Sequence, residues 1–176
     1  MSDLVVRRLD SSEAEQHLDA LAGVLLDCVL GGASVNYMAP FTLELARNAF
    51  SGFVADVPSG ARILLAAFMD DTLVGTVQLV PAPQPNQPHR AEVAKLLVHR
   101  SVRGRGVAQR LMEQVEEEAR ASRKTLLVLD TVTGGVAERL YARLGWIRLG
   151  VIPNYALYPD GRFCDTTVFY KELSGV

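Results

Sequence analysis

The stretch Arg103-Gly104-Arg105-Gly106-Val107-Ala108 decides the fold of this chain. It follows an apolar run, Ala94 to Val98 with Lys95 inside it, that is typical of a strand, and it opens an amphipathic helix that extends to about Ser122. Glycine lets the backbone turn tightly and approach a ligand closely, because it carries no Cβ. The first N–H groups of a helix have no intrahelical partner and attract anions. With two arginines beside it, the stretch predicts a diphosphate site.

Two better-known phosphate loops do not match. A P-loop would need Gly-Lys-Ser/Thr, and none follows Gly106. A dinucleotide-binding loop would need a small residue where Gln109 stands and an acidic residue about twenty positions further on, whereas Asp130 ends the next strand. What remains is R-x-x-G-x-A between a strand and a helix. The alternative is a glycine-containing turn that caps an ordinary helix.

Composition excludes several function classes. The chain has 176 residues, a length that favours a single domain spanning residues 1–176. It is 49% apolar and carries a net charge of −2, which argues against disorder and against nucleic-acid binding. No apolar run could span a bilayer and no signal-peptide core is present, so we expect no membrane partner and a cytoplasmic location. Cys28 and Cys164 lack metal spacing, and we expect free thiols and no metal; a disulfide between them is the alternative.

The order of predicted elements is mixed α/β with one central crossover. Strands are predicted at 4–9, 62–69, 73–80, 90–98, 125–129, 146–152 and 165–173, and helices at 14–29, 42–57, 107–122 and 136–144. The apolar run 125–129 is typical of a strand in a parallel pair, buried on both faces. The segment 153–162 is predicted as a turn. In the helix 107–122, Val107, Leu111 and Val115 should be buried, with Glu113, Glu116 and Glu117 facing solvent.

The loop resembles the acetyl-CoA pyrophosphate loop of the GCN5-related N-acetyltransferase (GNAT) family. The element order is also similar, and 140–146 (LYARLGW) resembles the family's L-Y-x-x-x-G-F ending. Within the family, the segments 31–35, 90–93, 129–131 and 159–162 resemble the tabtoxin-resistance acetyltransferases. The resemblance covers nearly the whole chain. It implies an α/β GNAT fold, in which helices flank a mixed, mostly antiparallel sheet with a splayed parallel pair formed by the fourth and fifth strands.

The resemblance implies acetyl-CoA as cosubstrate. The loop would bind the pyrophosphate, and the splayed strand would pair with the pantetheine through its backbone, with the Val98 N–H as oxyanion donor. Gly134 stands where many relatives carry a cofactor-contacting Asn, so this contact would come from the backbone or from Thr133. The expected cofactor-binding residues are Leu96, Leu97, Val98, Arg103, Gly104, Arg105, Gly106, Val107, Ala108 and Thr133.

Acetyl transfer to an amine needs a base for the amine and an acid for the departing thiolate. Alternation along the strand predicts that Glu92 shares an apolar face with residues 94, 96 and 98, where burial would raise its pKa and suit it to act as a base. The alternative is a rim carboxylate paired with Arg90 or His89.

Two further catalytic residues are expected. Asp130 ends a buried strand, where ligands collect in α/β sheets, and would bind or deprotonate the amine; the alternative is a loop cap. The resemblance implies that Tyr141 protonates the thiolate; the alternative is a core tyrosine with a satisfied hydroxyl.

The acceptor-binding site is the part of the protein that the sequence defines least. Segments 31–38, 81–88 and 154–162 should wall its site, and Ser34, Tyr37 and Tyr155 are the expected substrate-binding residues. The predicted function is direct acetyl transfer to a small amine, amino-acid-like or an antibiotic or toxin such as a tabtoxin-type β-lactam, and hence antibiotic resistance. Alternatives are acetylation of a protein N-terminus or lysine, and a non-catalytic acyl-CoA sensor. The apolar last strands also hint at a homodimer.

Overall fold

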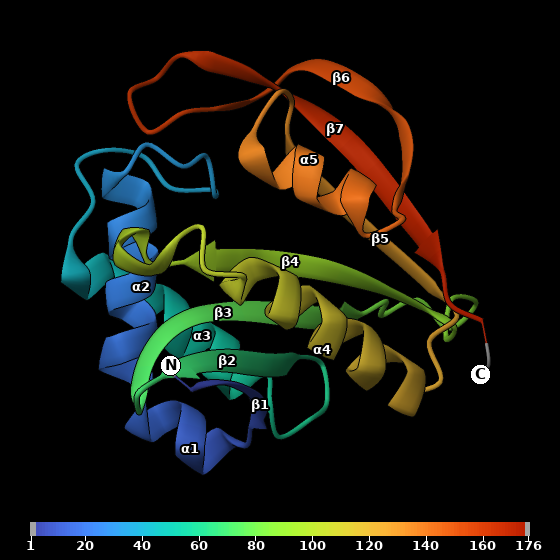
Figure 1. Cartoon of the computed structure of the whole chain (residues 1–176), viewed down its shortest axis with the longest axis horizontal. Coiled ribbons are helices and arrows are strands. Elements are labelled where there is room, and N and C mark those ends of the chain that lie inside the picture. Colours follow the sequence, from blue (N-terminus) through green and yellow to red (C-terminus); the bar gives the residue numbers. More distant parts are fainter. Residues whose placement is uncertain (1–2, 175–176) are drawn as a thin grey trace.

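One seven-stranded sheet organises the chain in the computed structural model, which describes residues 3–174 (Figure 1). The strand order is β1-β2-β3-β4-β5-β7-β6, and every neighbouring pair is antiparallel except β4 and β5. The strands are β1 (Leu4–Leu9), β2 (Ile63–Met69), β3 (Thr72–Pro81), β4 (Arg90–Val98), β5 (Leu126–Val132), β6 (Ile147–Leu157) and β7 (Phe163–Glu172). The predicted mixed sheet is confirmed.

The first predicted helix is two helices. A capping box begins α1, in which Asp10 Oδ1 accepts the Glu13 N–H at 2.8 Å and Glu13 Oε2 accepts the Asp10 N–H at 3.1 Å. The helical path then breaks at His17, whose ring packs edge-on against Phe68. The helices are α1 (Ser11–Gln16), α2 (Leu18–Leu30), α3 (Leu43–Ala55), the 3₁₀ turn η1 (Arg100–Val102), α4 (Val107–Ala121) and α5 (Val136–Arg143).

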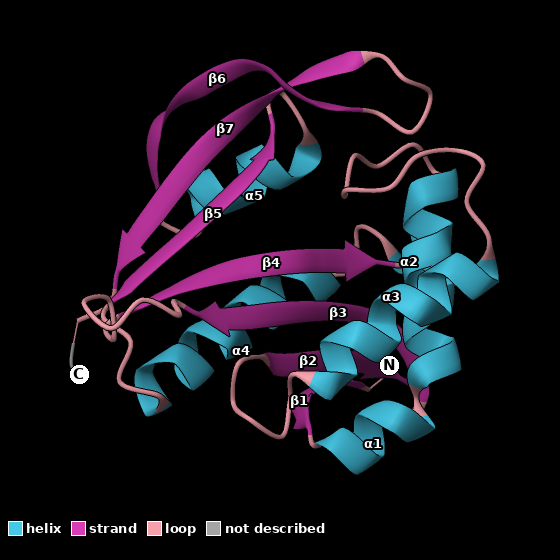
Figure 2. Ribbon diagram, turned by 180° about the vertical axis from the view of Figure 1, so that it is seen from behind, coloured by secondary structure: helices cyan, strands magenta, loops and turns pink. Residues whose placement is uncertain are grey.

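The helices divide between the two faces of the sheet (Figure 2). Alternating residues of β2 contribute to two separate cores: Leu65 packs with residues of α4 and α5, whereas Leu64 packs with residues of α2 and α3. We call these the α4 face and the α2–α3 face. No helix among residues 3–174 combines the length and apolar character that a membrane crossing requires.

A bulge in β4 reverses which residues point to which face. The register against β3 shifts between Thr76 and Gln78, and Lys95 adopts a positive φ of 51°. Before the bulge, Ala91 and Val93 belong to the α4-face core; after it, Leu96 and Val98 pack there. The predicted common face of residues 92, 94, 96 and 98 is therefore wrong, because the extra residue changes the alternation. Glu92 and Ala94 point to the α2–α3 face.

The parallel pair is joined at one end only. Residues 90–92 of β4 pair with residues 126–128 of β5, and the two strands then diverge (Figures 1 and 2). Beyond this point β5 continues to Val132 against β7. The facing edges, Val93–Val98 and Leu129–Val132, are therefore unpaired, and we refer to them as the unpaired edges. The splayed pair is confirmed, although β5 is longer than predicted.

Two further features differ from their predictions, one in β6 and one in α4. Residues 153–157, predicted as turn, extend β6, which tolerates Pro153 because it is an edge strand and its pairing is irregular between Ile152 and Ala156. Glu116, predicted to face solvent, is only 7% exposed. Its carboxylate accepts hydrogen bonds from Trp146 Nε1 at 3.1 Å and Lys171 Nζ at 2.8 Å, so it joins α4 to the C-terminal strands.

Candidate active site

The glycine loop presents free backbone donors. Gly104 and Gly106 have φ of 79° and 82°, and Gly106 is the N-cap of α4 without any side-chain cap. Within residues 3–174, the N–H groups from Gly104 to Ala108 find no acceptor. A Cβ built on either glycine would meet nothing within 4 Å, so the space beside the loop is open. The loop therefore presents backbone donors of the kind that bind a diphosphate.

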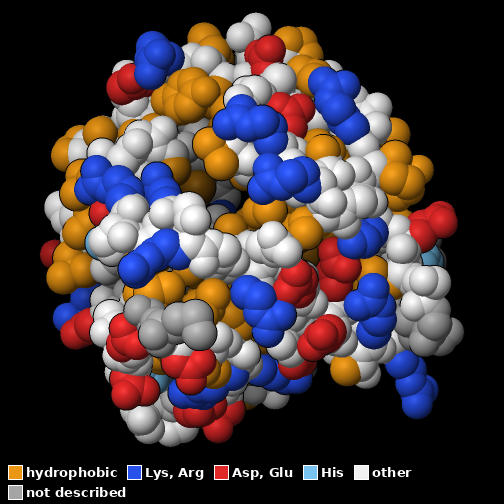
Figure 3. Space-filling view, viewed as in Figure 1, with side chains coloured by type: hydrophobic (Ala, Val, Ile, Leu, Met, Phe, Trp, Pro, Cys, Tyr) orange, Lys and Arg blue, Asp and Glu red, His pale blue; other side chains and the backbone are white. Residues whose placement is uncertain are grey.

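The two loop arginines contact protein atoms instead. Arg103 Nε donates to the Val98 carbonyl at 3.1 Å, and its Nη2 lies 3.6 Å from Cys28 Sγ. Arg105 Nη1 lies 3.2 Å from Met69 Sδ. The loop N–H groups therefore remain free, and both exposed guanidinium groups keep N–H donors that these contacts do not use. Figure 3 shows a hollow on this side of the molecule, left of centre, with Lys and Arg side chains gathered around it.

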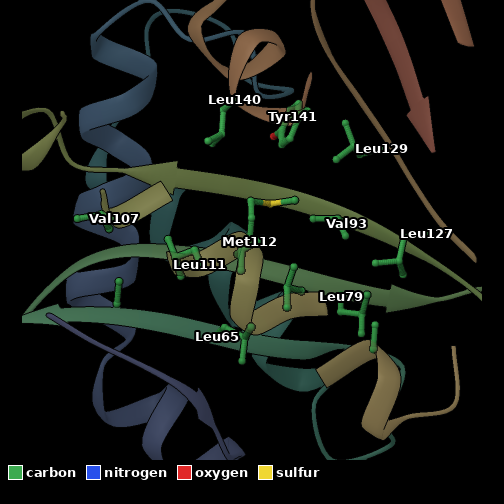
Figure 4. Close-up of a cluster of buried hydrophobic side chains, with 14 of the residues drawn as sticks. Leu65, Leu79, Val93, Val107, Leu111, Met112, Leu127, Leu129, Leu140 and Tyr141 are labelled. Atoms are coloured by element: carbon green, nitrogen blue, oxygen red, sulfur yellow. The ribbon is translucent and has the colours of Figure 1, made fainter. Parts of the chain in front are cut away.

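Tyr141 projects from α5 toward β4 in the α4-face core (Figure 4). Its ring packs against Trp146 and Phe169, with centroids 6.1 and 5.8 Å away. No group in residues 3–174 hydrogen-bonds its hydroxyl, so the alternative of a satisfied core tyrosine does not hold. Burial raises the pKa of Tyr141 above its ordinary value, and the nearby Asp130 carboxylate adds to the shift. The phenol therefore keeps a proton that it can donate.

Two carboxylates lie on the opposite face. Glu92 is exposed, contrary to the predicted burial. Arg90 does not pair with Glu92, because its guanidinium donates to the Gln87 side chain. Asp130 is also exposed and accepts a hydrogen bond from Thr166 Oγ1 at 2.9 Å. Since Leu129 belongs to the α4-face core, alternation directs Asp130 to the α2–α3 face, where Glu92 also points. The unpaired edges thus have Tyr141 on one side and carboxylates on the other.

The start of α5 is fixed by hydrogen bonds. The Gly134 N–H donates to the Glu138 carboxylate, which holds the pKa of Glu138 below its usual value despite some burial. Thr133, expected to contact the cofactor, shares a 2.9 Å hydrogen bond with the Thr167 hydroxyl. The Thr133 hydroxyl and the Gly134 N–H therefore both already have hydrogen-bond partners within the protein.

The expected substrate-binding residues differ in their surroundings. Ser34 Oγ donates to the Leu157 carbonyl at 2.6 Å, and the Ala39 N–H donates to Pro159 O at 3.0 Å, so the segment between α2 and α3 is fixed to the β6–β7 hairpin. Tyr37 is half-buried and packs on Phe41 at 4.8 Å. Tyr155 is 56% exposed.

Sequence reasoning missed three polar residues on the α2–α3 face. Lys95 lies in the β4 bulge, Gln78 is fully buried on β3, and Arg62 immediately precedes β2. The available signal was Lys95, a charged residue inside an apolar strand segment. No cluster of His, Cys, Asp and Glu among the described residues could hold a metal ion.

Comparison with known proteins agrees with this architecture. Residues 33–146 match the model of the acetyltransferase (GNAT) family. An uncharacterised N-acetyltransferase from the hisH–hisA intergenic region of Azospirillum brasilense is 34% identical over 132 residues, which is 74% of this chain and 76% of that protein.

Solved structures share the fold at low sequence identity. The protein yncA of Salmonella typhimurium, solved with its cofactor acetyl-CoA, has a TM-score of 0.80 at 19% identity, covering 98% of this chain and 95% of its own. The ribosomal-protein-alanine N-acetyltransferase of Brucella melitensis has a TM-score of 0.80 at 22% identity, covering 96% and 99%. With the matched family model and the curated relative, these findings show that this chain belongs to the acetyltransferase (GNAT) family.

Proposed function

We propose that this acetyl-CoA-dependent N-acetyltransferase transfers the acetyl group directly to the amine of a small, amino-acid-like molecule. The main support for this proposal is the position of Glu92 and Asp130, two exposed carboxylates that point to the α2–α3 face beside the unpaired edges. Carboxylates at this place suit a cationic amine. The glycine loop and Tyr141 lie on the α4 face, so donor and acceptor would approach the edges from opposite sides.

The glycine loop and β4 would hold the cofactor. The N–H groups from Gly104 to Ala108 would bind the pyrophosphate, and the edge of β4 at Leu96, Leu97 and Val98, which does not pair with β5, would pair with the pantetheine amides. Bound acetyl-CoA supplies an activated acetyl group as a thioester. The Val98 N–H would stabilise the negative charge that develops on the carbonyl oxygen of the thioester.

The side chains would move the protons. Glu92 or Asp130 would take a proton from the ammonium form of the acceptor, because only the free amine is a nucleophile. Tyr141 would give its proton to the departing thiolate, a role supported by the absence of a hydrogen-bond partner for its hydroxyl among residues 3–174 and by its raised pKa. Thr133 would contribute only after its hydrogen bond with Thr167 rearranges.

A small acceptor fits better than a protein chain. The contacts of Ser34 with Leu157 and of Ala39 with Pro159 close the segment between α2 and α3 onto the β6–β7 hairpin. An extended polypeptide would need this side to be open. Among small acceptors, a tabtoxin-type β-lactam and hence a resistance role follow from the resemblance of segments 31–35 and 159–162. The exposed apolar residues of β6, such as Leu149 at 71%, support a homodimer.

A thiol-release assay tests the proposal. Acetyl-CoA is offered with amino acids, polyamines, amine antibiotics and peptides with free N-termini, and the expected result is release with amino acids or amine antibiotics. Release with peptides alone would favour protein acetylation. Tight acetyl-CoA binding without release for any acceptor would favour a sensor, and Tyr141→Phe would then change neither binding nor turnover.

A further inference from the structure

Lys95 is a cation that acetyl transfer itself does not require. Its half-buried side chain lies in the β4 bulge, and its Nζ makes no hydrogen bond or ion pair within residues 3–174. Burial and the nearby Arg62 guanidinium lower the pKa of Lys95, while Glu92 and Asp130 oppose this shift. Partial removal of an ammonium group from water without a hydrogen-bond partner costs free energy, so binding of an anion to Lys95 would be favourable.

The other lysines show how this chain treats such groups. The chain contains three lysines. Lys171 Nζ is held by both Glu116 oxygens at 2.8 Å and by the Leu144 carbonyl at 2.7 Å. Lys124 Nζ donates to the Pro88 carbonyl at 2.6 Å. Lys95 therefore differs from both in lacking an acceptor among the described residues.

Gln78 provides an independent observation that points to a missing acceptor. It is fully buried, and its Nε2 is the buried side-chain polar atom that lacks a hydrogen-bond partner among residues 3–174. The amide orientation is fixed, because Oε1 accepts from Arg62 Nη1 at 2.5 Å and a guanidinium can only donate. An unpaired buried amide is costly, and protein interiors rarely leave one.

Arg62 is itself held in place. Its Nε and Nη2 donate to Asp56 Oδ2 at 3.3 and 3.2 Å, and the guanidinium stacks over the Phe53 ring at 4.6 Å. It therefore positions the Gln78 amide and contributes positive charge, but its own donors are largely used. Its charge also reaches Tyr37, where it partly opposes the burial that raises the pKa of that tyrosine.

The unpaired groups come from adjacent positions of the sheet. Gln78 on β3 is the register partner of Ala94, which directly precedes Lys95. The bulge directs both residues 94 and 95 to the α2–α3 face, because Val93 and Leu96 on either side pack on the α4 face. Glu92 and Asp130 point to the same α2–α3 face. Cationic donors and carboxylates therefore lie next to each other, as recognition of a zwitterion requires.

We propose that the acceptor carries a carboxylate, which Lys95 Nζ and Gln78 Nε2 bind while Glu92 and Asp130 receive its amine. This inference rests on the proposed function and narrows it to amino acids and closely related amines with a carboxylate. Two donors match the two oxygens of such a group. Polyamines lack an acceptor for these donors, and an amino-acid amide offers one neutral carbonyl oxygen in place of two charged oxygens.

Matched acceptors test the inference in a thiol-release assay. Each amino acid is compared with its amide and with the corresponding decarboxylated amine. The wild-type enzyme should use the acid with a kcat/KM about 10- to 100-fold above that of its amide, as expected for a charge-assisted hydrogen bond. Lys95→Met should remove most of this ratio by lowering kcat/KM for the acid alone. Lys124→Met, the matched control, should leave the ratio unchanged.

Equal use of acid and amide by the wild type, or an unchanged ratio in Lys95→Met, would overturn the inference while leaving acetyl transfer intact. A second readout does not need turnover. Titration with the free amino acids should shift the NMR signals of the Gln78 side-chain amide and the Lys95 ε-methylene group, whereas the amides should not. If no acceptor is acetylated but these shifts occur, the proposed function fails and the carboxylate site stands. If amino acids shift neither signal, the site itself is wrong.

Discussion

The two faces of the splayed sheet are built in different ways. On the α4 face, consecutive backbone N–H groups of a glycine loop present donors, and they come from one short segment of the chain. On the α2–α3 face, the polar groups are single side chains from separate segments of the chain: Arg62, Gln78, Lys95 and Asp130. A backbone site suits a cofactor that all members of a family share. A side-chain site can change one residue at a time, and so it can adapt to the acceptor.

The largest expected effect concerns Tyr141, which lies on the α4 face beside the unpaired edges. Tyr141→Phe should lower kcat by about 100- to 1000-fold, the usual range for loss of a general acid, with little change in the KM for acetyl-CoA. Stability should change by less than about 0.5 kcal/mol, because the hydroxyl makes no hydrogen bond that would be lost. Tyr170→Phe serves as control. A kcat within twofold of the wild type would remove Tyr141 from the chemistry.

The backbone site should fail when its conformation is blocked. Gly106→Val places a β-branched residue at a φ of 82°, so the loop must move and its N–H groups lose their alignment. The Kd for acetyl-CoA, measured by calorimetry, should rise by about 100-fold. Gly60→Val imposes similar strain, at a φ of 74°, far from the loop in sequence. Equal affinity in both variants would contradict a cofactor site at the loop.

The attachment of α4 to the C-terminal strands should affect stability rather than affinity. Glu116→Gln removes the charge that holds Lys171 and weakens the contact with Trp146. The free energy of unfolding in urea should fall by about 2 kcal/mol, as for other hydrogen bonds to charged groups. Glu117→Gln, at an exposed position of the same helix, should cost almost nothing. Similar losses in both variants would mean that Glu116 does not join these elements.

The smallest effect concerns the start of the helix that carries Tyr141. The Gly134 N–H lowers the folded-state pKa of Glu138 below 4.5, so the unfolded chain binds its proton more readily. The resulting stabilisation is complete above pH 4.5 and is lost as the pH falls through the lowered folded-state pKa. Glu138→Gln should therefore cost about 0.5 kcal/mol at pH 7, after solvent screening, and nothing in acid. A pH-independent difference in urea midpoints would contradict this assignment.

The contrast between the faces also explains what the sequence could predict. The glycine loop, the strand 125–129 and the helix 107–122 are local patterns, and their conformations depend on neighbours in the chain. The orientation of Glu92 could not be predicted, because it depends on a bulge whose register is set by pairing with β3. Glu116 was misassigned for a related reason. Its partners Trp146 and Lys171 are 30 and 55 residues away.

The most direct test of the separation between the two faces is an amide NMR titration of the ¹⁵N-labelled protein with coenzyme A. The largest shifts are expected at Gly104 to Ala108 and along the unpaired edge of β4 up to Val98. Signals from Ser34, Tyr37 and Arg62 should move little. The largest shifts at these three residues, with an unchanged glycine loop, would place the cofactor on the α2–α3 face and contradict a cofactor site at the glycine loop.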